Sequence, residues 1–275
     1  MRDSATFAGT NEETRPRRTN TVIVGAGAAG LAAAACLQKQ GVPFVLLEKS
    51  NQVGSPWRNH YDRLHVHTDR ANSRLPNLPM PEHYPKYPAR AQVVEYLELY
   101  ASHFGLEPEF GQEVVSATRR DGVWQTKSHA ALYESPNLVV ATGYTRVPYG
   151  PNVQIRQDSQ IPILDIGTVK LIKNGRIHIH PGIERFTGNG VIFTDGAEAK
   201  FDAVILGTGY KPRVNAFLPD VDGILDEEGA PLTNGVEASP GLFFCGFYVS
   251  PTGMLREIGI EAKQISQAIA RNQIG

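Results

Sequence analysis

The first hydrophobic stretch of the chain begins as a strand pattern and continues as a helix pattern. Residues 21–24 read TVIV, a β-branched run typical of a buried strand, and residues 28–40 form an alanine-rich helical stretch that Gly41 ends. A second apolar run, FVLLE, occupies residues 44–48. Strand, helix and strand in this order predict a βαβ unit with parallel strands. The uncharged stretch 21–37 has 17 residues, which is short for a membrane span, and it turns glycine-rich.

The middle of the chain predicts an irregular arm, one long helix and several short strands. Residues 76–88 hold five prolines, which remove backbone donors and fix φ, so an irregular surface arm is expected there. Residues 91–104 carry an amphipathic helix pattern that Gly105 ends. Short strands are expected near residues 113–119, 123–127 and 138–141. A loop with Gly143, Pro148, Gly150 and Pro151 follows.

From residue 164 to 210 the pattern changes to a short helix or turn and then short strands with hairpin turns. The strand-like segments read RIHIH, VIFT and AVIL, with turn signals at Asn189-Gly190 and Asp195-Gly196. We expect a β-meander with strands at 176–180, 191–194 and 203–206, the last of them buried. Residues 241–246 predict a last buried strand, and residues 254–271 predict a C-terminal helix.

Composition narrows the class of protein without changing this picture of the fold. The chain has 275 residues, a formal net charge of −1 and no long basic run, which argues against a nucleic-acid-binding surface. Basic residues gather only at Arg15, Arg17 and Arg18, beside two glutamates, so residues 1–19 are expected to be a disordered tail. This tail lacks the apolar segment of a signal peptide. The two cysteines are far apart in sequence, which fits a reducing cytoplasm.

The turn between the first strand and the first helix reads Gly25-Ala26-Gly27-Ala28-Ala29-Gly30, a GxGxxG pattern. Glu48 lies 18 residues beyond Gly30, at the end of the next predicted strand. This is the context of a dinucleotide-binding turn: Gly25 permits the tight turn, Gly27 lets a pyrophosphate approach the backbone, and Gly30 lets helix pack on strand. Glu48 is expected to accept hydrogen bonds from the adenosine ribose, and its charge disfavours a 2′-phosphate. The pattern alone does not distinguish FAD from NAD.

The remaining histidines, cysteines and paired glutamates predict no second site. Two histidine pairs lie two residues apart on predicted strands, but no third metal ligand has suitable spacing, so surface or structurally bonded histidines are expected and no metal. The pairs are His65 with His67 and His178 with His180. Cys36 is expected to be a small core residue and Cys245 an inert buried thiol. Glu257 and Glu261, one turn apart on the last helix, are expected to face solvent.

Several longer segments carry a more specific signal. They are GSPWRNHYDRLHVHT (54–68), LPNLPMPEHYPKYPAR (75–90), VVEYLELYASHFGLEPEF (93–110), LVVATGYTRVP (138–148), PILDIGT (162–168), PGIERFT (181–187), DAVILGTGYKP (202–212) and GLFFCGF (241–247). Together they resemble the flavin-containing monooxygenases, most closely the plant auxin-forming YUCCA type and its bacterial relatives. The resemblance implies an α/β fold. Its main part would be a three-layer Rossmann-like FAD-binding domain of the glutathione-reductase type, with a parallel sheet and a β-meander.

The resemblance implies that the first nucleotide site holds FAD. Trp57 would lie over the cofactor, although Ser55 interrupts the glycine pair that precedes this tryptophan in much of the family. His67 would face the flavin as the candidate catalytic residue; the alternative is a packed strand residue. The last helix would direct its positive N-terminus at the flavin. The residues assigned to FAD are Gly25, Gly27, Ala28, Ala29, Gly30, Glu48, Lys49, Trp57, Arg58, His67, Val115, Ala141, Thr142, Gly143, Gly246, Phe247, Met254 and Leu255.

One part of the family pattern is missing from the chain. Neither the F-x-G-x-x-x-H motif nor the second GxGxxG, which opens the NADPH domain in the family, can be found. The glycines of Gly207-Thr208-Gly209 are followed by Pro212 where a third glycine should be. The resemblance therefore implies an FAD-binding domain over residues 20–150 and 211–275, with residues 160–210 as a remnant β-meander of the NADPH domain.

Two functions of different classes follow. One is an FAD-dependent oxidoreductase reduced by free NAD(P)H, a partner reductase or the substrate itself. Oxygen would be its acceptor and hydrogen peroxide the main product, because the missing domain would have sheltered the flavin from water. The other is a non-catalytic FAD-binding protein: a remnant, a regulatory partner or a trimmed scaffold. We expect a small organic substrate as partner, and neither nucleic acid nor membrane. The open sheet edge in residues 164–210 is expected to fold back on the FAD domain or to pair across a homodimer.

Overall fold

The computed structural model describes residues 15–145, 147–148 and 167–273. The chain divides into two compact units, one formed by Met1–Val147 together with Tyr210–Gly275 and the other by Pro148–Gly209. The first unit is thus built from two stretches of chain that the second unit separates in sequence. The predicted loop positions Gly150 and Pro151 and most of the PILDIGT segment lie outside the described residues.

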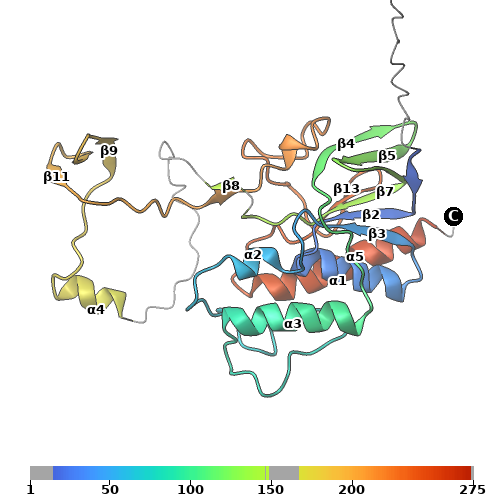
Figure 1. Cartoon of the computed structure of the whole chain (residues 1–275), viewed down its shortest axis with the longest axis horizontal. Helices are drawn as coiled ribbons and strands as arrows, with labels where there is room; N and C mark the ends of the chain where they lie inside the picture. Colours follow the sequence, from blue (N-terminus) through green and yellow to red (C-terminus); the bar gives the residue numbers. More distant parts are fainter. Residues whose placement is uncertain (1–14, 146, 149–166, 274–275) are drawn as a thin grey trace, which may run out of the picture. The chain divides into compact units, whose positions relative to one another are not determined.

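A five-stranded sheet forms the centre of the first unit (Figure 1). Its order is β13 (Glu237–Ser239), β14 (Leu242–Phe244), β7 (Asn137–Val140), β2 (Thr21–Val24) and β3 (Phe44–Leu47). The neighbours β14, β7, β2 and β3 run parallel, and β13 joins the edge antiparallel. Strands β2 and β7 are buried along their whole length, as expected for central strands of a parallel sheet covered on both faces. The predicted βαβ unit and the last buried strand are confirmed.

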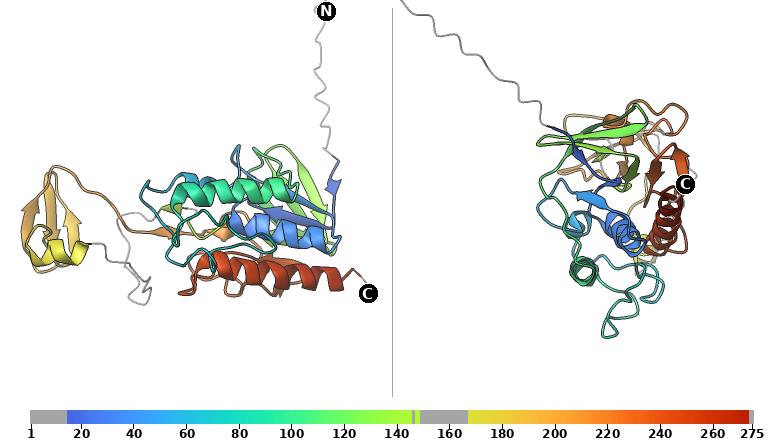
Figure 2. Two further views of the ribbon diagram at one scale, coloured as in Figure 1. Left: turned by 90° about the horizontal axis from the view of Figure 1, so that it is seen from below. Right: turned by 90° about the vertical axis from the view of Figure 1, so that its right-hand side faces the viewer.

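Three helices cover one face of this sheet (Figures 1 and 2). They are α1 (Ala28–Lys39), α3 (Arg90–His103) and α5 (Met254–Arg271). Successive residues of a strand point to opposite faces, so Ile23 and Val139 pack in the cluster that these helices complete. Val22 and Leu138 pack in a second cluster on the other face, together with Trp124. The helices predicted at 28–40, 91–104 and 254–271 are therefore confirmed to within a residue at each end.

A four-stranded sheet covers the second face. Its order is β1 (Arg17–Arg18), β6 (Leu132–Ser135), β5 (Val123–Ser128) and β4 (Val114–Arg120), with β1 parallel to β6 and the other pairs antiparallel. Strand β6 was not predicted, because only Pro136 separates its four residues from β7. The expected disordered tail is corrected as well: residues 17–18 form an edge strand, because they find hydrogen-bonding partners on β6, whereas residues 1–14 lie outside the described part.

The second unit contains a short helix and an antiparallel three-stranded sheet in the described residues. The helix is α4 (Thr168–Lys173), and the sheet order is β11 (Glu198–Lys200), β10 (Gly190–Phe193) and β9 (Ile183–Phe186). The first strand was predicted at 176–180 and lies instead at β9. A tight hairpin pairs the residues that directly flank its turn. The turn spans residues 187–190, and Phe186 pairs with Val191, so the first strand lies just before residue 187. The turns at 189–190 and 195–196 are confirmed.

The predicted buried strand at residues 203–206 is wrong. These residues form no strand, and their side chains are exposed, Ile205 by 94%. Among the described residues of this unit the sheet ends at β11, so no neighbouring strand is present to pair with 203–206. The segment leads to β12 (Tyr210–Lys211), which pairs with β8 (Val147–Pro148) in a separate two-stranded sheet.

The connections of the first unit carry two short helical turns. They are α2 (Ser55–Arg58) and the 3-10 turn η1 (Val214–Ala216). Within the described ranges, no helix is both long and apolar enough to cross a membrane.

Candidate functional site

The GxGxxG turn joins β2 to α1 at the carboxyl edge of the central sheet. Gly25 has a φ of +106°, and a Cβ on it would lie 2.6 Å from the carbonyl oxygen of Ala141. The Gly25 N–H donates to the Leu47 carbonyl at 2.7 Å, and the Ala141 N–H donates to the Val24 carbonyl at 2.9 Å. The turn is therefore held directly against the ends of β3 and β7, and only glycine fits its first position.

Gly30 and Gly27 differ in what surrounds them. A Cβ on Gly30 would lie 1.7 Å from the Gly25 carbonyl oxygen, so α1 can approach the turn this closely only with glycine there. A Cβ on Gly27 would meet no atom within 4 Å. This open space lies at the N-terminus of α1, where the first N–H groups have no intrahelical partner and the helix dipole is positive. Such a position suits an anionic group.

Glu48 follows β3 directly and is buried. Its Oε2 accepts a hydrogen bond from the Ala26 N–H at 2.7 Å, and its Oε1 accepts one from the Ser50 N–H at 2.9 Å. Each carboxylate oxygen has two acceptor positions, so both can still accept a hydroxyl donor. Glu48 therefore links the glycine turn to the next loop and keeps capacity for a ligand.

The segment after β7 supplies a small threonine-glycine turn beside the glycine turn. Ala141 is buried, and Gly143 has a φ of +79°. Between them, the buried hydroxyl oxygen of Thr142 has no hydrogen-bond partner among the described residues. Buried hydroxyls are nearly always hydrogen-bonded to protein, water or ligand, so this hydroxyl is a candidate contact for a bound ligand.

Gly246 and Phe247 bring the C-terminal stretch of the chain to the first turn of α1. Gly246 has a φ of +84°, and a Cβ on it would lie 2.7 Å from the Ala29 Cβ. Phe247 is buried, and its ring meets Phe244 edge-on at 6.0 Å between centroids. We refer to residues 25–30, 48, 141–143 and 246–247 as the nucleotide cradle.

Trp57 lies on α2, which is tied to the cradle by its backbone. The N–H of Gly54, the residue that precedes α2, donates to the Ala26 carbonyl at 3.2 Å. The Trp57 side chain is partly buried and packs against the helix-side core. Arg58 points elsewhere: its guanidinium donates to the Val53 carbonyl and pairs with Glu98 on α3.

His67 lies on the outside of the first unit, near the start of α5. Its side chain is exposed. The next residue, Thr68, packs against Gly253, where a Cβ would lie 2.6 Å from Thr68 Cγ2. Gly253 is the N-cap of α5, so the Thr68 side chain lies beside the start of the helix whose first turn holds Met254 and Leu255. The exposed side chain does not fit the alternative of a packed strand residue.

Two further residues assigned by resemblance are on the surface. Lys49 is exposed, and Val115 is exposed on β4. Val115 lies three residues beyond Gln112, whose N–H donates to the Glu48 carbonyl at 2.9 Å. Lys49 directly follows Glu48 in sequence, and Val115 lies three residues from a backbone hydrogen-bond partner of Glu48.

Glu261 is a buried carboxyl beside the cradle that the sequence interpretation placed in solvent. It is 6% exposed, and its Oε2 accepts a hydrogen bond from the Gly246 N–H at 2.7 Å. Burial raises the pKa of Glu261 above its usual range, and the Gly246 N–H opposes the rise. Helical spacing could have predicted this burial, because Glu261 lies three residues after Ile258 and four before Ile265, both of which face the core. The Glu257 side chain is also mostly covered, at 16% exposed, and it accepts hydrogen bonds from Thr252 and Arg256.

The two cysteines behave as core residues. Both are free and buried, and burial raises the pKa of Cys36 to about 11 and that of Cys245 well above its usual range. Thiols in such surroundings stay protonated at neutral pH and react slowly. Their predicted structural roles are confirmed.

The chain is similar in sequence to plant monooxygenases. It is 28% identical to the indole-3-pyruvate monooxygenase YUCCA1 of Oryza sativa subsp. japonica, over 82% of this chain and 86% of that protein. It is 28% identical to the indole-3-pyruvate monooxygenase YUCCA6 of Arabidopsis thaliana, over 85% of this chain and 88% of that protein.

Solved structures share the architecture at lower identity. The flavin-containing monooxygenase of Stenotrophomonas maltophilia superposes with a TM-score of 0.77 at 19% identity, covering 94% of this chain and 99% of that chain. The bacillithiol disulfide reductase Bdr of Bacillus cereus superposes with a TM-score of 0.78 at 20% identity, covering 93% and 100%. The α/β fold predicted by resemblance to flavin monooxygenases is confirmed at this level.

A match to a protein-family model shows which family the chain belongs to. The model described as pyridine nucleotide-disulphide oxidoreductase matches residues 22–179, which is more than half of the chain. The chain therefore belongs to the pyridine nucleotide-disulphide oxidoreductase family, and it is an oxidoreductase with monooxygenases among its homologues.

Proposed function

We propose that the chain is a flavoprotein oxidoreductase that binds FAD in the nucleotide cradle. The observation that carries the proposal is the contrast within the glycine turn. Gly25 and Gly30 are closed off by backbone atoms, whereas the space beside Gly27 is empty at the N-terminus of α1. A pyrophosphate needs this combination of a rigid turn, an open approach and unpaired helix N–H groups.

Two further observations support the fit of an adenine-dinucleotide flavin. The Thr142 hydroxyl is buried in the cradle with no hydrogen-bond partner in the part of the chain that the structure describes, so a ligand atom there would satisfy it. The Glu48 carboxylate retains acceptor positions for the ribose hydroxyls while its two protein hydrogen bonds hold it in place. Trp57 and the α5 N-terminus would border the flavin end, where the helix dipole stabilises negative charge.

When bound, FAD would pass two electrons between a donor and an acceptor. The residues of this chain would bind and orient it: Gly27 and the α1 N-terminus at the pyrophosphate, Glu48 at the adenosine ribose, and Thr142 near the ribityl and phosphate region. His67 remains the candidate catalytic residue, and its exposed position beside the α5 N-terminus would leave it accessible to a small organic substrate.

We further propose that the nucleotide-binding core of an NADPH domain is missing. The alignment with the rice YUCCA1 protein extends over 348 positions, although 82% of 275 residues is only about 226 residues. The relative therefore carries long segments with no counterpart here. Neither remaining glycine pair opens a helix: residues 188–190 form the β9–β10 turn, and residues 207–209 lead into β12. Reduction would then come from free NAD(P)H, a partner reductase or the substrate, with oxygen as acceptor.

A second candidate is a non-catalytic FAD-binding protein, which the same shortened segment favours. The two candidates share the cofactor and differ in turnover. Mixing the FAD-loaded protein with NADH or NADPH under anaerobic conditions should bleach the visible flavin absorption if the chain is an enzyme that accepts these donors.

FAD binding itself is tested by purification. The protein should be yellow and should release FAD when denatured. A colourless protein that binds NAD but not added FAD would contradict the proposal that the cradle binds FAD.

A further inference from the structure

Residues 109–112 form a strap along the outer edge of β3, next to Glu48. The Glu109 N–H donates to the Leu46 carbonyl at 2.8 Å, and the Glu48 N–H donates to the Glu109 carbonyl at 2.9 Å. Beyond the end of the strand, the Gln112 N–H donates to the Glu48 carbonyl at 2.9 Å, and the Gly111 N–H donates to the Ser50 carbonyl at 3.0 Å. The strap therefore holds the backbone on both sides of the Glu48 carboxylate.

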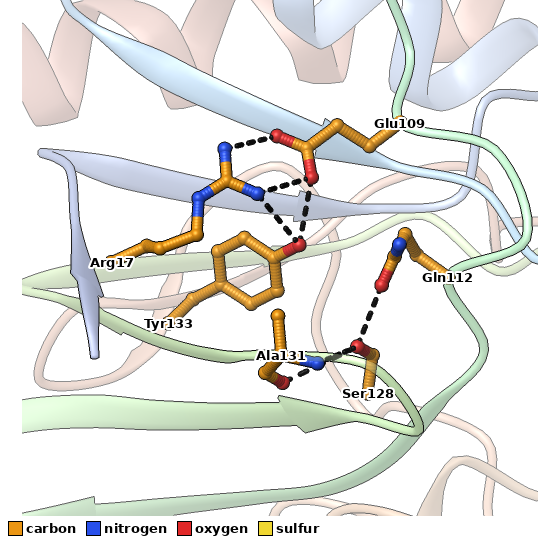
Figure 3. Close-up of polar contacts among 6 residues, drawn as sticks. All are labelled: Arg17, Glu109, Gln112, Ser128, Ala131 and Tyr133. Atoms are coloured by element: carbon orange, nitrogen blue, oxygen red, sulfur yellow. Dashed lines mark hydrogen bonds and ion pairs between the residues drawn. The ribbon is translucent and has the colours of Figure 1, made fainter. Parts of the chain in front are cut away.

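One end of the strap is anchored by a cluster of three side chains (Figure 3). The Arg17 guanidinium donates to both carboxylate oxygens of Glu109, at 2.7 Å and 2.6 Å, and lies over the ring of Tyr133 at 5.1 Å from its centroid. The Tyr133 hydroxyl donates to Glu109 Oε2 at 2.7 Å. Burial would raise the pKa of Glu109, but Arg17 and Tyr133 outweigh burial and lower it. Glu109 thus stays ionised and bound from two sides.

The other end is anchored by a neutral contact. The Ser128 hydroxyl donates to the Gln112 side-chain oxygen at 2.7 Å and accepts a hydrogen bond from the Ala131 N–H at 3.0 Å (Figure 3). Both anchors join the strap to the β1–β6–β5–β4 sheet. Of the two, only the first anchor includes a residue of β1, Arg17.

We propose that Arg17 is a positioning residue for the adenosine end of the nucleotide, acting through Glu109 and the strap on Glu48. The inference rests on the proposed FAD site. The fork of Arg17 fixes the Glu109 carboxylate in one geometry, which a single charge at the same place would not do. Because Glu109 exchanges backbone hydrogen bonds with residues 46 and 48, its position sets where the Glu48 carboxylate lies. Arg17 is 54% exposed and Glu109 28%, so the expected effect is modest.

The test compares Arg17→Met with Arg18→Met in the full-length protein stripped of FAD. Arg18 is a matched control on the same strand, because it pairs with Glu134 at 3.0 Å and does not touch the strap. Arg17→Met should raise the dissociation constants of FAD and of ADP by roughly three- to tenfold, since both ligands carry the adenosine diphosphate part. Arg18→Met should leave both unchanged, and Arg17→Lys should restore part of the loss.

Hydrogen exchange and thermal unfolding of the apoprotein separate positioning from general stability. In Arg17→Met, the Glu48 amide should exchange faster while the unfolding midpoint stays close to that of Arg18→Met. If Arg17→Met does not fold, Glu109→Gln serves instead, since it keeps one acceptor and removes the charge. Unchanged FAD and ADP affinities in the variants of a protein that binds FAD would overturn the inference alone. A wild-type protein that binds neither ligand would overturn the proposed site and this inference with it.

Discussion

Gly27 and Gly30 are three residues apart, yet a side chain would enter open space at Gly27 and collide with the backbone at Gly30. Gly27→Leu should fold, because the space is open and φ is −78°, with an unfolding free energy within about 1 kcal/mol of the wild type. It should lose FAD affinity by at least about 100-fold, because the side chain would occupy the place of the pyrophosphate. Apoprotein unfolding and FAD titration measure the two effects.

Gly30→Ala is the matched comparison. Its Cβ would lie 1.7 Å from a backbone oxygen, so the variant should be strongly destabilised before any ligand is considered. A Gly27→Leu protein that binds FAD as the wild type does would contradict the placement of the pyrophosphate.

Glu261 predicts how the stability of the apoprotein depends on pH. Its folded-state pKa is raised, so between the ordinary glutamate value and the folded value the native state holds a proton that the unfolded state has lost. This group therefore lowers stability as the pH rises through that window. Glu261→Gln keeps an acceptor for the Gly246 N–H and removes the charge, so it should unfold at a higher temperature than the wild type at pH 8. Each kcal/mol corresponds to about 2–4 °C.

The comparison with the wild type isolates this group, because all other groups titrate in both proteins. At pH 4 the difference should vanish or reverse. Glu257→Gln is the control: its carboxylate pairs with Arg256 and accepts from Thr252, so that variant should be less stable at pH 8. A Glu261→Gln protein that is equally destabilised at both pH values would refute the pH argument.

At the scale of elements, the sequence predicted the parts that carry a strong local pattern. The βαβ unit follows from two apolar strand-like runs around an alanine-rich helix, and the glycine pattern alone predicts its turn. The residues that complete the cradle around this turn are harder to predict from local patterns. Thr142, Gly246 and Phe247 reach the cradle only through the order of strands in the central sheet, and resemblance, rather than periodicity, brought them together.

The two wrong strand predictions fall on segments that have no strand to pair with among the described residues. The alternation in residues 176–180 and the apolar run 203–206 both predict strands, but a strand also needs a partner, and the described sheet of the second unit supplies none for them. Arg17 was misassigned for the converse reason. A short charged segment has no pattern of its own, and its place is set by Glu109 and Tyr133, which lie about 90 to 120 residues away in sequence.

The exposed apolar segment 203–206 predicts self-association. The segment is apolar, uncharged and partly β-branched, and its exposed side chains offer a surface that a second copy can cover. Ile205→Lys should raise the dissociation constant of a homodimer by more than about tenfold, as followed by analytical ultracentrifugation. Leu232→Lys, an equally drastic change at an exposed apolar residue of the first unit, is the control. A wild-type protein that stays monomeric at high concentration would count against the prediction.

At the scale of the whole molecule, the short second unit predicts weak and unselective use of nicotinamides. No phosphate-binding glycine turn besides residues 25–30 is present in the described residues, and the Glu48 charge is unfavourable to a 2′-phosphate. NADH and NADPH should therefore reduce the flavin at similar rates and saturate only at high concentration, because few contacts offset the entropy lost on association. Turnover under air should release mainly hydrogen peroxide.

Stopped-flow reduction with both nicotinamides, together with peroxide quantification, checks this prediction. Micromolar affinity for NADPH with a strong preference over NADH would show that the chain retains a dedicated site. So would oxygenated product in stoichiometric yield with little peroxide.

The order of β13, β14, β7, β2 and β3 also determines when the protein can take up its cofactor during synthesis. Strand β14 pairs with β7, and Gly246 packs on Ala29, yet both follow the second unit in the chain. Ribosomes add about 5–20 residues per second, so β7 waits several seconds or more with one edge unpaired while the second unit is made. Loading of the proposed cofactor would therefore be a late event in the life of each new chain, and until β14 emerges, the edge of β7 is the surface that chaperones would have to protect.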